Sequence, residues 1–68
     1  MTTMNITLNG HATEVEADTL SEIVRTVTSR RTGVAAAVGG QVVPRSEWDT
    51  TVVHDGDVIE VVAAVQGG

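Results

Sequence analysis

Apolar and polar residues alternate along the first part of the chain, which is the pattern of half-buried strands. Over residues 4–8, three apolar side chains alternate with Asn5 and Thr7, and the pair Asn9-Gly10 follows. An Asn-Gly pair between alternating segments is the strongest short-range signal for a tight hairpin turn. The alternation resumes over residues 11–17. We therefore expect a β-hairpin at the start of the fold.

The period then changes from that of a strand to that of a helix. Thr19 and Glu22 have the spacing of a capping box, in which each side chain can satisfy the other residue's free backbone N–H. Gly33 can serve as the C-terminal stop. The pattern predicts a helix from about residue 19 to residue 30. Its apolar stripe has the spacing i, i+3, i+4 and i+7 and consists of Leu20, Ile23, Val24 and Val27.

Glycine and proline divide the rest of the chain into short apolar segments. Pro44 cannot donate a hydrogen bond to a strand ladder, so it ends the segment before it. The longest apolar run comes last, and strands that are apolar on both faces usually lie in the middle of a sheet. We expect strands over residues 34–38, 41–43 and 58–65, a turn at 39–40, a loop or single short turn over 44–51 and a second turn at 55–57.

This order of elements predicts an α+β domain in which one helix covers one face of a four- or five-stranded sheet. The last strand should lie at the centre of the sheet, parallel to the first and reached through a crossover connection. Sixty-eight residues suffice for one domain. We expect that domain over residues 4–68, with residues 1–3 as an N-terminal extension and residues 66–68 as a flexible C-terminal tail.

The composition argues against several classes of function. A formal charge of −5, with four arginines and no lysine, argues against nucleic acid, because phosphate binding needs clustered cations. The absence of cysteine excludes disulfides and thiolate metal sites. His11 and His54 each lie beside a turn, far apart in sequence, so we expect no metal site. No apolar run approaches the roughly 20 residues of a membrane span, so we expect no membrane segment and a cytoplasmic location.

The most informative chemical feature is the pair Gly67-Gly68 at the end of the sequence. A glycine pair at a given position arises by chance in roughly 0.5% of cases. Glycine has no Cβ, so such an end is narrow, and its carboxylate is unhindered. A chain this short has no room for a deep catalytic cleft. We therefore expect the reacting group to be the main-chain terminus itself, which makes the protein a substrate or carrier and not an enzyme.

The order of elements, ended by Gly-Gly, resembles the ubiquitin-like β-grasp fold. Within it, the segments 42–48 (Val-Val-Pro-Arg-Ser-Glu-Trp) and 55–62 (Asp-Gly-Asp-Val-Ile-Glu-Val-Val) resemble the ThiS family. Residues 5–10 (Asn-Ile-Thr-Leu-Asn-Gly) are also similar to that family. ThiS proteins carry the sulfur for the thiazole ring of thiamine, so the resemblance implies a sulfur carrier.

The resemblance also implies partners and a reaction at the terminus. A ThiF-like adenylating enzyme, which itself binds ATP and Mg²⁺, would attach AMP to the carboxylate of Gly68. A persulfide or another sulfur donor would then displace AMP and leave a thiocarboxylate, whose sulfur thiazole synthase would accept. Gly67 and Gln66 would give the tail its access to the enzyme. We expect no cofactor bound by this chain.

Three alternatives remain open from the sequence. The chain could be a sulfur carrier for molybdopterin, cysteine or tRNA thiolation, because specificity lies in the partner. It could be a ubiquitin-like modifier joined through Gly68 to lysines of other proteins. A passive interaction module is the third alternative, for which Gly68 would be dispensable.

Partner docking is predicted on the last strand. If the helix covers one face of the sheet, the Val-rich strands can expose an apolar patch on the other, which would mark an interaction site. The pattern does not say which side of the strand is exposed. Trp48, the only aromatic residue, is expected to pack onto the core, and contact with a partner is its less favoured interpretation. The docking set is Val58, Glu60, Val62 and Ala64, with Trp48 added to it; Ile59, Val61, Ala63 and Val65 share the other side of the strand.

Overall fold

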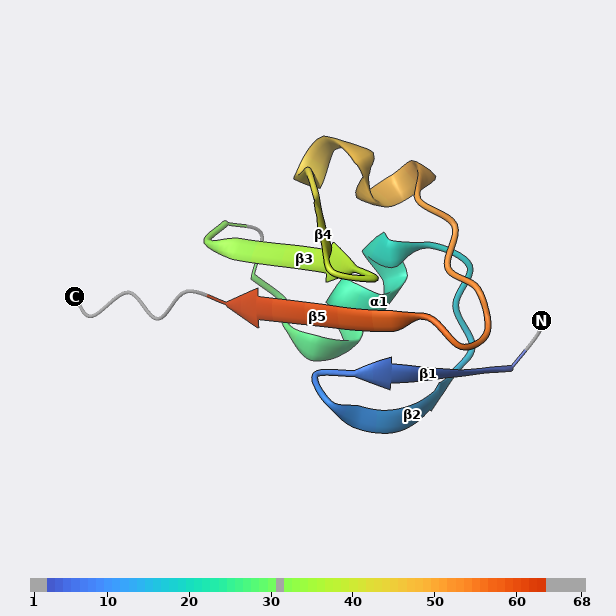
Figure 1. Ribbon diagram of the computed structural model, residues 1–68. Coiled ribbons are helices and arrows are strands. Elements are labelled where there is room, and N and C mark those ends of the chain that lie inside the picture. The colour runs from blue at the N-terminus through green and yellow to red at the C-terminus, as the bar shows by residue number, and fades with distance from the viewer. Residues whose placement is uncertain (1–2, 31, 64–68) are drawn as a thin grey trace.

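The alternating segments form five strands, and the stripe of helical spacing forms one α-helix (Figure 1). The computed structural model describes residues 3–30 and 32–63. Residues 1–2, Arg31 and residues 64–68 lie outside this part of the chain. The elements are β1 (Met4–Leu8), β2 (His11–Val15), α1 (Leu20–Val27), β3 (Val34–Val38), β4 (Gln41–Val43), the 3₁₀ helix η1 (Arg45–Thr50) and β5 (Val58–Ala63).

The strands form one mixed five-stranded sheet in the order β2-β1-β5-β3-β4. β5 lies at the centre, parallel to β1 and antiparallel to β3. The two hairpins, β1–β2 and β3–β4, turn at Asn9-Gly10 and at Gly39-Gly40, where all four residues have positive φ. The α+β class, the central last strand and its parallel pairing with the first strand are therefore confirmed.

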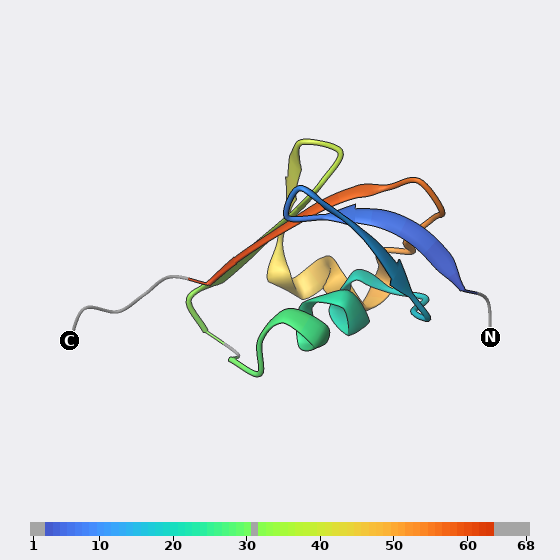
Figure 2. The same cartoon turned by 90° about the horizontal axis from the view of Figure 1, so that it is seen from below.

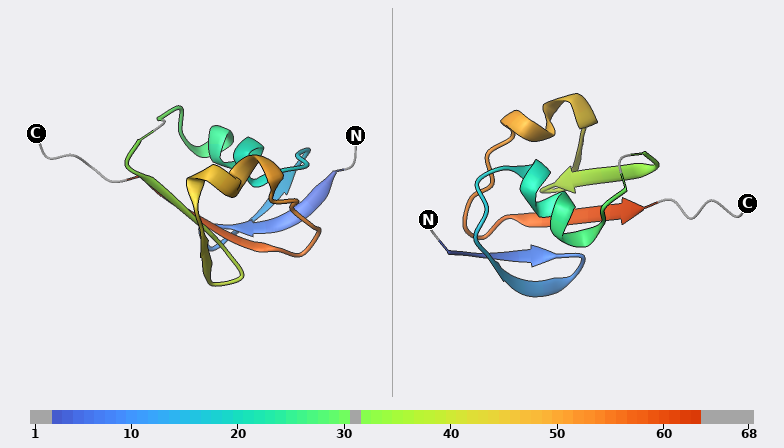
Figure 3. Two further views of the ribbon diagram at one scale, coloured as in Figure 1. Left: turned by 90° about the horizontal axis from the view of Figure 1, so that it is seen from above. Right: turned by 180° about the vertical axis from the view of Figure 1, so that it is seen from behind.

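The helices cover one face of this sheet and leave the other open. α1 and η1 lie on the same side of the sheet (Figure 2), and both views of Figure 3 agree with this arrangement. Figure 1 looks onto the opposite side, which no element of the described chain covers. The core lies between the sheet and the two helices; its buried residues are Met4, Ile6, Ala17, Leu20, Ile23, Val24, Ala36, Trp48, Val53, Ile59 and Val61.

Trp48 belongs to this core, as the sequence predicts. Its side chain is only 7% exposed, and its indole Nε1–H donates a hydrogen bond of 2.9 Å to the backbone oxygen of Val43. A buried indole N–H needs such a partner. This bond joins η1 to the end of β4. The segment 44–51, which we expect as a loop or a single short turn, is mostly a 3₁₀ helix that starts directly after Pro44.

The start of α1 is as predicted, but its end is not. Glu22 Oε1 accepts hydrogen bonds from the backbone N–H groups of Asp18 and Thr19, at 3.1 and 3.2 Å, which completes this half of the capping box. The helix ends at Val27, not near residue 30, because Thr28 is already extended (φ −152°, ψ 148°). Three β-branched residues in succession, 26–28, disfavour further helix.

Three smaller expectations about the ends of elements are also wrong. Gly33 is not the helix stop: its positive φ of 69° lies just before β3, where the chain turns back into the sheet. Val27, the last residue of the predicted stripe and of the helix, is exposed. The strand β2 ends at Val15 and not at residue 17. The strand β5 is described only to Ala63, so residues 64 and 65 of the expected strand lie outside the described part.

The pairing of β1 with β5 is short, and side chains extend it at both ends. Only two residue pairs, Thr7 with Val58 and Leu8 with Ile59, form the parallel register. Before β5 begins, Asp55 Oδ1 accepts a 2.7 Å hydrogen bond from the N–H of Asn5. The backbone oxygen of Asn5 in turn accepts a hydrogen bond of 2.8 Å from the N–H of Gly56. Asp55, a residue of the predicted turn at 55–57, therefore bonds a strand fifty positions away.

At the other end, the side chain of Asn9 continues the ladder. Its backbone N–H donates to the oxygen of Ile59 at 2.9 Å, and its Oδ1 then accepts from the N–H of Val61 at 2.8 Å. The amide oxygen replaces the next backbone carbonyl of β1, because the chain turns at Asn9-Gly10. Asn9 therefore makes the turn and also holds the second half of β5 against β1.

Replacing Asn9 by glycine should remove this hydrogen bond without straining the turn, since glycine also accepts the positive φ of 50°. The N–H of Val61 would then lack its acceptor, and we expect a loss of about 1–3 kcal/mol in the free energy of unfolding, measured by urea denaturation. Asn9→Asp keeps an acceptor oxygen and should lose less. Equal losses in the two variants would contradict the role given to the side-chain oxygen.

Candidate functional site

The two sides of β5 differ sharply in exposure. Ile59 and Val61 point into the core, whereas Val58 is 49% and Val62 is 63% exposed, and Glu60 between them is exposed as well. The sequence pattern could not choose between these two sides. The packing of α1 and η1 against the side of Ile59 and Val61 decides the question. Three of the four strand residues predicted for docking are therefore exposed; Ala64 lies outside the described residues.

Cross-strand neighbours extend this exposed side into a surface. Val62 is paired with Ala35, Glu60 with Ala37, and Ala37 in turn with Val42, which is 74% exposed. Paired residues point to the same face of a sheet, so these side chains are neighbours on one surface. We call the part of this surface on β3, β4 and β5 the open face; it consists of Ala35, Ala37, Val42, Val58, Glu60 and Val62. Thr7 of β1, which is paired with Val58, borders it.

The open face is apolar except at its centre, where Glu60 is its only ionisable residue. Nothing within the described chain buries these valines, so their apolar surface contributes little to folding. A grouped apolar surface of this kind marks an interaction site. Trp48 does not belong to it, because its ring is buried on the helical side of the sheet; this corrects its inclusion in the docking set.

The predicted chemical residues lie beyond the end of β5. The strand is described to Ala63, which pairs with Val34, the first residue of β3. Gln66, Gly67 and Gly68 follow it in sequence and lie outside the described residues. The structure therefore defines the strand that leads to the terminal residues and leaves their predicted role as a proposal.

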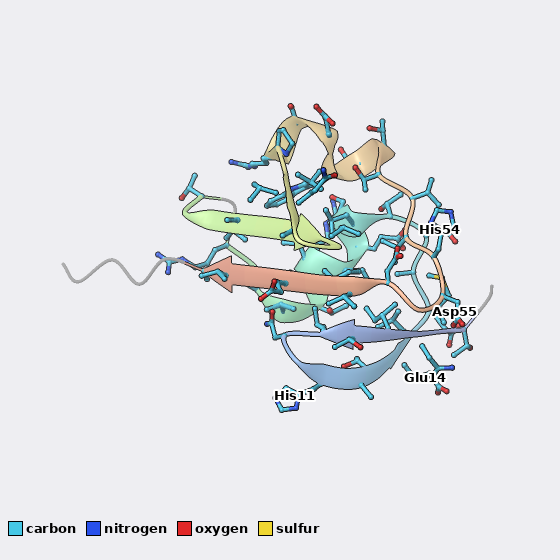
Figure 4. The ribbon with its side chains drawn as sticks, viewed as in Figure 1. His11, Glu14, His54 and Asp55 are labelled. Atoms are coloured by element: carbon cyan, nitrogen blue, oxygen red, sulfur yellow. The ribbon has the colours of Figure 1, made fainter. Side chains whose placement is uncertain are left out.

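The histidines and carboxylates of the described chain do not gather into a cluster that could bind a metal ion. His11 and His54 lie on different sides of the molecule (Figure 4). His54 Nδ1 lies 3.9 Å from Asp57 Oδ2. The same carboxylate oxygen accepts a hydrogen bond of 2.8 Å from the backbone N–H of His54, which is typical of an aspartate in a turn. Over residues 3–30 and 32–63, no group of three or more histidines and carboxylates could hold a metal ion.

No helix within these two ranges is long and apolar enough to cross a membrane.

Comparison with known proteins gives one family. The model of the ThiS family matches residues 6–68. The chain is 35% identical to the sulfur carrier protein ThiS of Escherichia coli (strain K12) over 66 residues, which cover 96% of this chain and 100% of that protein. It is 36% identical over 61 residues to the sulfur carrier protein ThiS of Thermus thermophilus, covering 90% of this chain and 95% of the relative.

Solved structures agree with this result. The crystal structure of the thiamine biosynthesis protein ThiS from Geobacter metallireducens superimposes with a TM-score of 0.77 at 30% identity, covering 96% of this chain and all of that one. The solution structure of a thiamine biosynthesis protein from the same organism gives a TM-score of 0.78 at 29% identity, covering 96% of this chain and 88% of that one. The expected ubiquitin-like β-grasp fold is thereby confirmed.

Two neighbouring valines of β5 test the assignment of the faces. Val62→Thr places a hydroxyl on the open face, where water can reach it, so the free energy of unfolding should change by no more than about 0.5 kcal/mol. Val61→Thr places the same hydroxyl in the core and should cost about 1–3 kcal/mol. Urea denaturation of both variants measures the difference. Similar costs at the two positions would contradict the assignment.

Proposed function

The chain belongs to the ThiS family and is a sulfur carrier of thiamine biosynthesis; we propose that Gly68 is the residue that carries the sulfur, as a terminal thiocarboxylate. The observation that carries this proposal is the family match, which continues through Gly67 to Gly68. The family model and both sulfur carrier relatives are ThiS, which favours the thiazole ring of thiamine over molybdopterin, cysteine or tRNA thiolation as the destination of the sulfur.

A sulfur carrier acts through partner enzymes that load it and receive from it, and the first step needs activation of the carboxylate. A terminal carboxylate is ionised at neutral pH and is therefore a nucleophile, but it is a poor acylating agent. In the proposed first step, an oxygen of the Gly68 carboxylate attacks the α-phosphorus of ATP, and pyrophosphate leaves. The ATP and its Mg²⁺ belong to a ThiF-like adenylating enzyme, since this chain has no Gly-rich phosphate loop followed by Lys.

In the second step, sulfur replaces the activated oxygen. The terminal sulfur of a persulfide attacks the carbonyl carbon of the acyl adenylate, and AMP leaves. A thiol then cleaves the S–S bond and releases the thiocarboxylate of Gly68, which thiazole synthase accepts as its sulfur source. The two glycines suit this task, because the absence of Cβ atoms lets the chain enter a narrow channel and leaves the reacting carbon uncrowded.

The open face is the proposed docking surface for these enzymes. The tail residues 66–68 span at most about 10 Å, so the folded body must lie close to the enzyme that binds the tail. The exposed valines of β5 belong to the strand that leads to the tail, and they give that enzyme an apolar surface to bury. We assign docking to Val58, Glu60 and Val62, and to Ala64 beyond the described strand.

The terminal chemistry is tested by mass spectrometry of the whole protein. Incubation with ATP, Mg²⁺, a persulfide donor, a thiol reductant and a ThiF-like enzyme known to be active on its own carrier should raise the intact mass by the difference between sulfur and oxygen. Fragmentation should place the change at Gly68. A variant with one alanine appended after Gly68 should remain unmodified, because its carboxylate no longer belongs to glycine. No mass change in the parent protein would sink the proposal.

The docking surface is tested by a pair of equally exposed valines. Val62→Gln should raise the KM of loading about three- to tenfold, because it removes apolar contact within the proposed interface. Val52→Gln is the matched control, since Val52 is 59% exposed and lies outside the five strands. Thermal denaturation verifies that both variants fold. Docking elsewhere would be indicated if the two substitutions changed KM equally.

A further inference from the structure

A cleft of about 520 Å³ lies between α1 and η1, on the side of the sheet opposite the open face. Its lining includes Arg25 and Arg30 from the end of α1 and the segment after it, and Arg45 from the first turn of η1. These are all the cations of the described chain, because the fourth arginine, Arg31, lies outside it. Asp49 is the only carboxylate in the lining.

The charge of this cleft is opposite to that of the protein. Three arginines and one aspartate give it a formal charge of +2, whereas the whole chain carries −5. A second hollow, between β2 and α1, shows the contrast: it contains three glutamates and shares with the cleft only Arg25 as a cation. The positive charge is therefore gathered in one place on an otherwise acidic molecule.

Folding does not account for this arrangement. A cation in the last turn of a helix is favourable, and this explains Arg25. Arg45 belongs to a different element, at the N-terminal end of η1, where a cation gains nothing from the helix dipole. Within the described residues, neither Arg25 nor Arg45 forms an ion pair with a carboxylate. Arg25 and Arg45 are both exposed and line the same cleft, and neither side chain has a polar partner among residues 3–30 and 32–63.

We propose that this arginine cleft binds an acidic segment of a protein partner, by ion pairs from its arginines to carboxylates. A guanidinium presents a planar fork that binds a carboxylate through two parallel hydrogen bonds. Arg25 stands on α1, Arg30 on the segment after it and Arg45 on η1, around a space larger than a single phosphate needs. No Gly-rich loop supplies the converging backbone N–H groups typical of a phosphate site. Several carboxylates along a peptide match this spread of charge better than one compact anion.

Such a cleft would orient the whole protein on its partner. A chain with a formal net charge of −5 is repelled by an acidic protein at a distance. The formal charge of +2 on the cleft makes one orientation of approach favourable. α1 ends toward the end of the molecule at which β5 ends (Figure 2). A partner segment held in the cleft therefore lies near the end of the body from which the chain continues to the tail, and it leaves the open face uncovered.

Binding can be measured without any sulfur chemistry, so its failure is distinct from failure of the proposed function. The probe is an N-acetylated, C-amidated hexaglutamate, titrated into the full ¹⁵N-labelled chain and followed by NMR; hexaglutamine is the neutral control peptide. Trp48 lines the cleft and supplies the only indole N–H of the chain, so its signal reports on this site. We expect shifts at Trp48, Arg25 and Arg45, and weaker binding as salt is raised.

Two double variants of equal net charge complete the test. Arg25→Gln with Arg45→Gln removes two cations from the cleft and should weaken hexaglutamate binding about fivefold or more. Thr3→Glu with Gln41→Glu changes the net charge by the same amount at exposed sites outside the cleft and should bind nearly as the parent does. Equal weakening in both variants, no shifts at the cleft, or binding of inorganic pyrophosphate but not of hexaglutamate would overturn the proposal.

Discussion

The position of β5 depends on a parallel contact with β1 that is only two residue pairs long. A contact this short would leave backbone groups unpaired on both sides of it, and two polar side chains satisfy them. Asp55 binds the start of β1 before β5 begins, and Asn9 binds the N–H of Val61 after β1 has turned away. Because β5 is the central strand, these two side chains help to fix the strand on which the core, the open face and the path to the terminus all depend.

With β5 in place, each side of the sheet has a separate role. Ile59 and Val61 join the residues of α1 and Trp48 in the core, which provides the apolar burial that a small domain needs. Val58 and Val62 remain exposed and are available to a partner. On the helical side, the arginine cleft supplies the one positive region of the described surface. The folded body thus offers surfaces for recognition, and the proposed chemistry takes place on residues beyond it.

The sequence predicted those features that depend on neighbouring residues. Thr19 and Glu22 predicted the start of α1, and Asn9-Gly10 predicted the first hairpin, because caps and tight turns are decided locally. The end of α1 was predicted wrongly, since Gly33 serves the entry into β3 and not the helix. The order of elements predicted the central strand, because a helical crossover between two parallel strands allows few topologies.

What the sequence could not supply depends on contacts between distant residues. Asp55 and Asn9 were recognisable as turn residues, but their partners lie fifty and fifty-two positions away. Alternation divides β5 into two faces, and only the placement of α1 decides which of them is buried. The gathering of arginines from α1 and η1 into one cleft likewise requires the folded arrangement. The family resemblance, by contrast, was visible from short segments spread along the chain, and the match over residues 6–68 confirms it.

The central claim is that the sulfur which reaches thiazole travels on Gly68. It is tested most directly by preparing the carrier with an isotopically labelled sulfur atom in a terminal thiocarboxylate and supplying it to thiazole synthase with its sugar-phosphate and amine-derived substrates. The predicted result is labelled sulfur in the thiazole product, with the carrier returned to its carboxylate mass in equal amount. Unlabelled thiazole, or label retained on the carrier while thiazole forms, would contradict the claim.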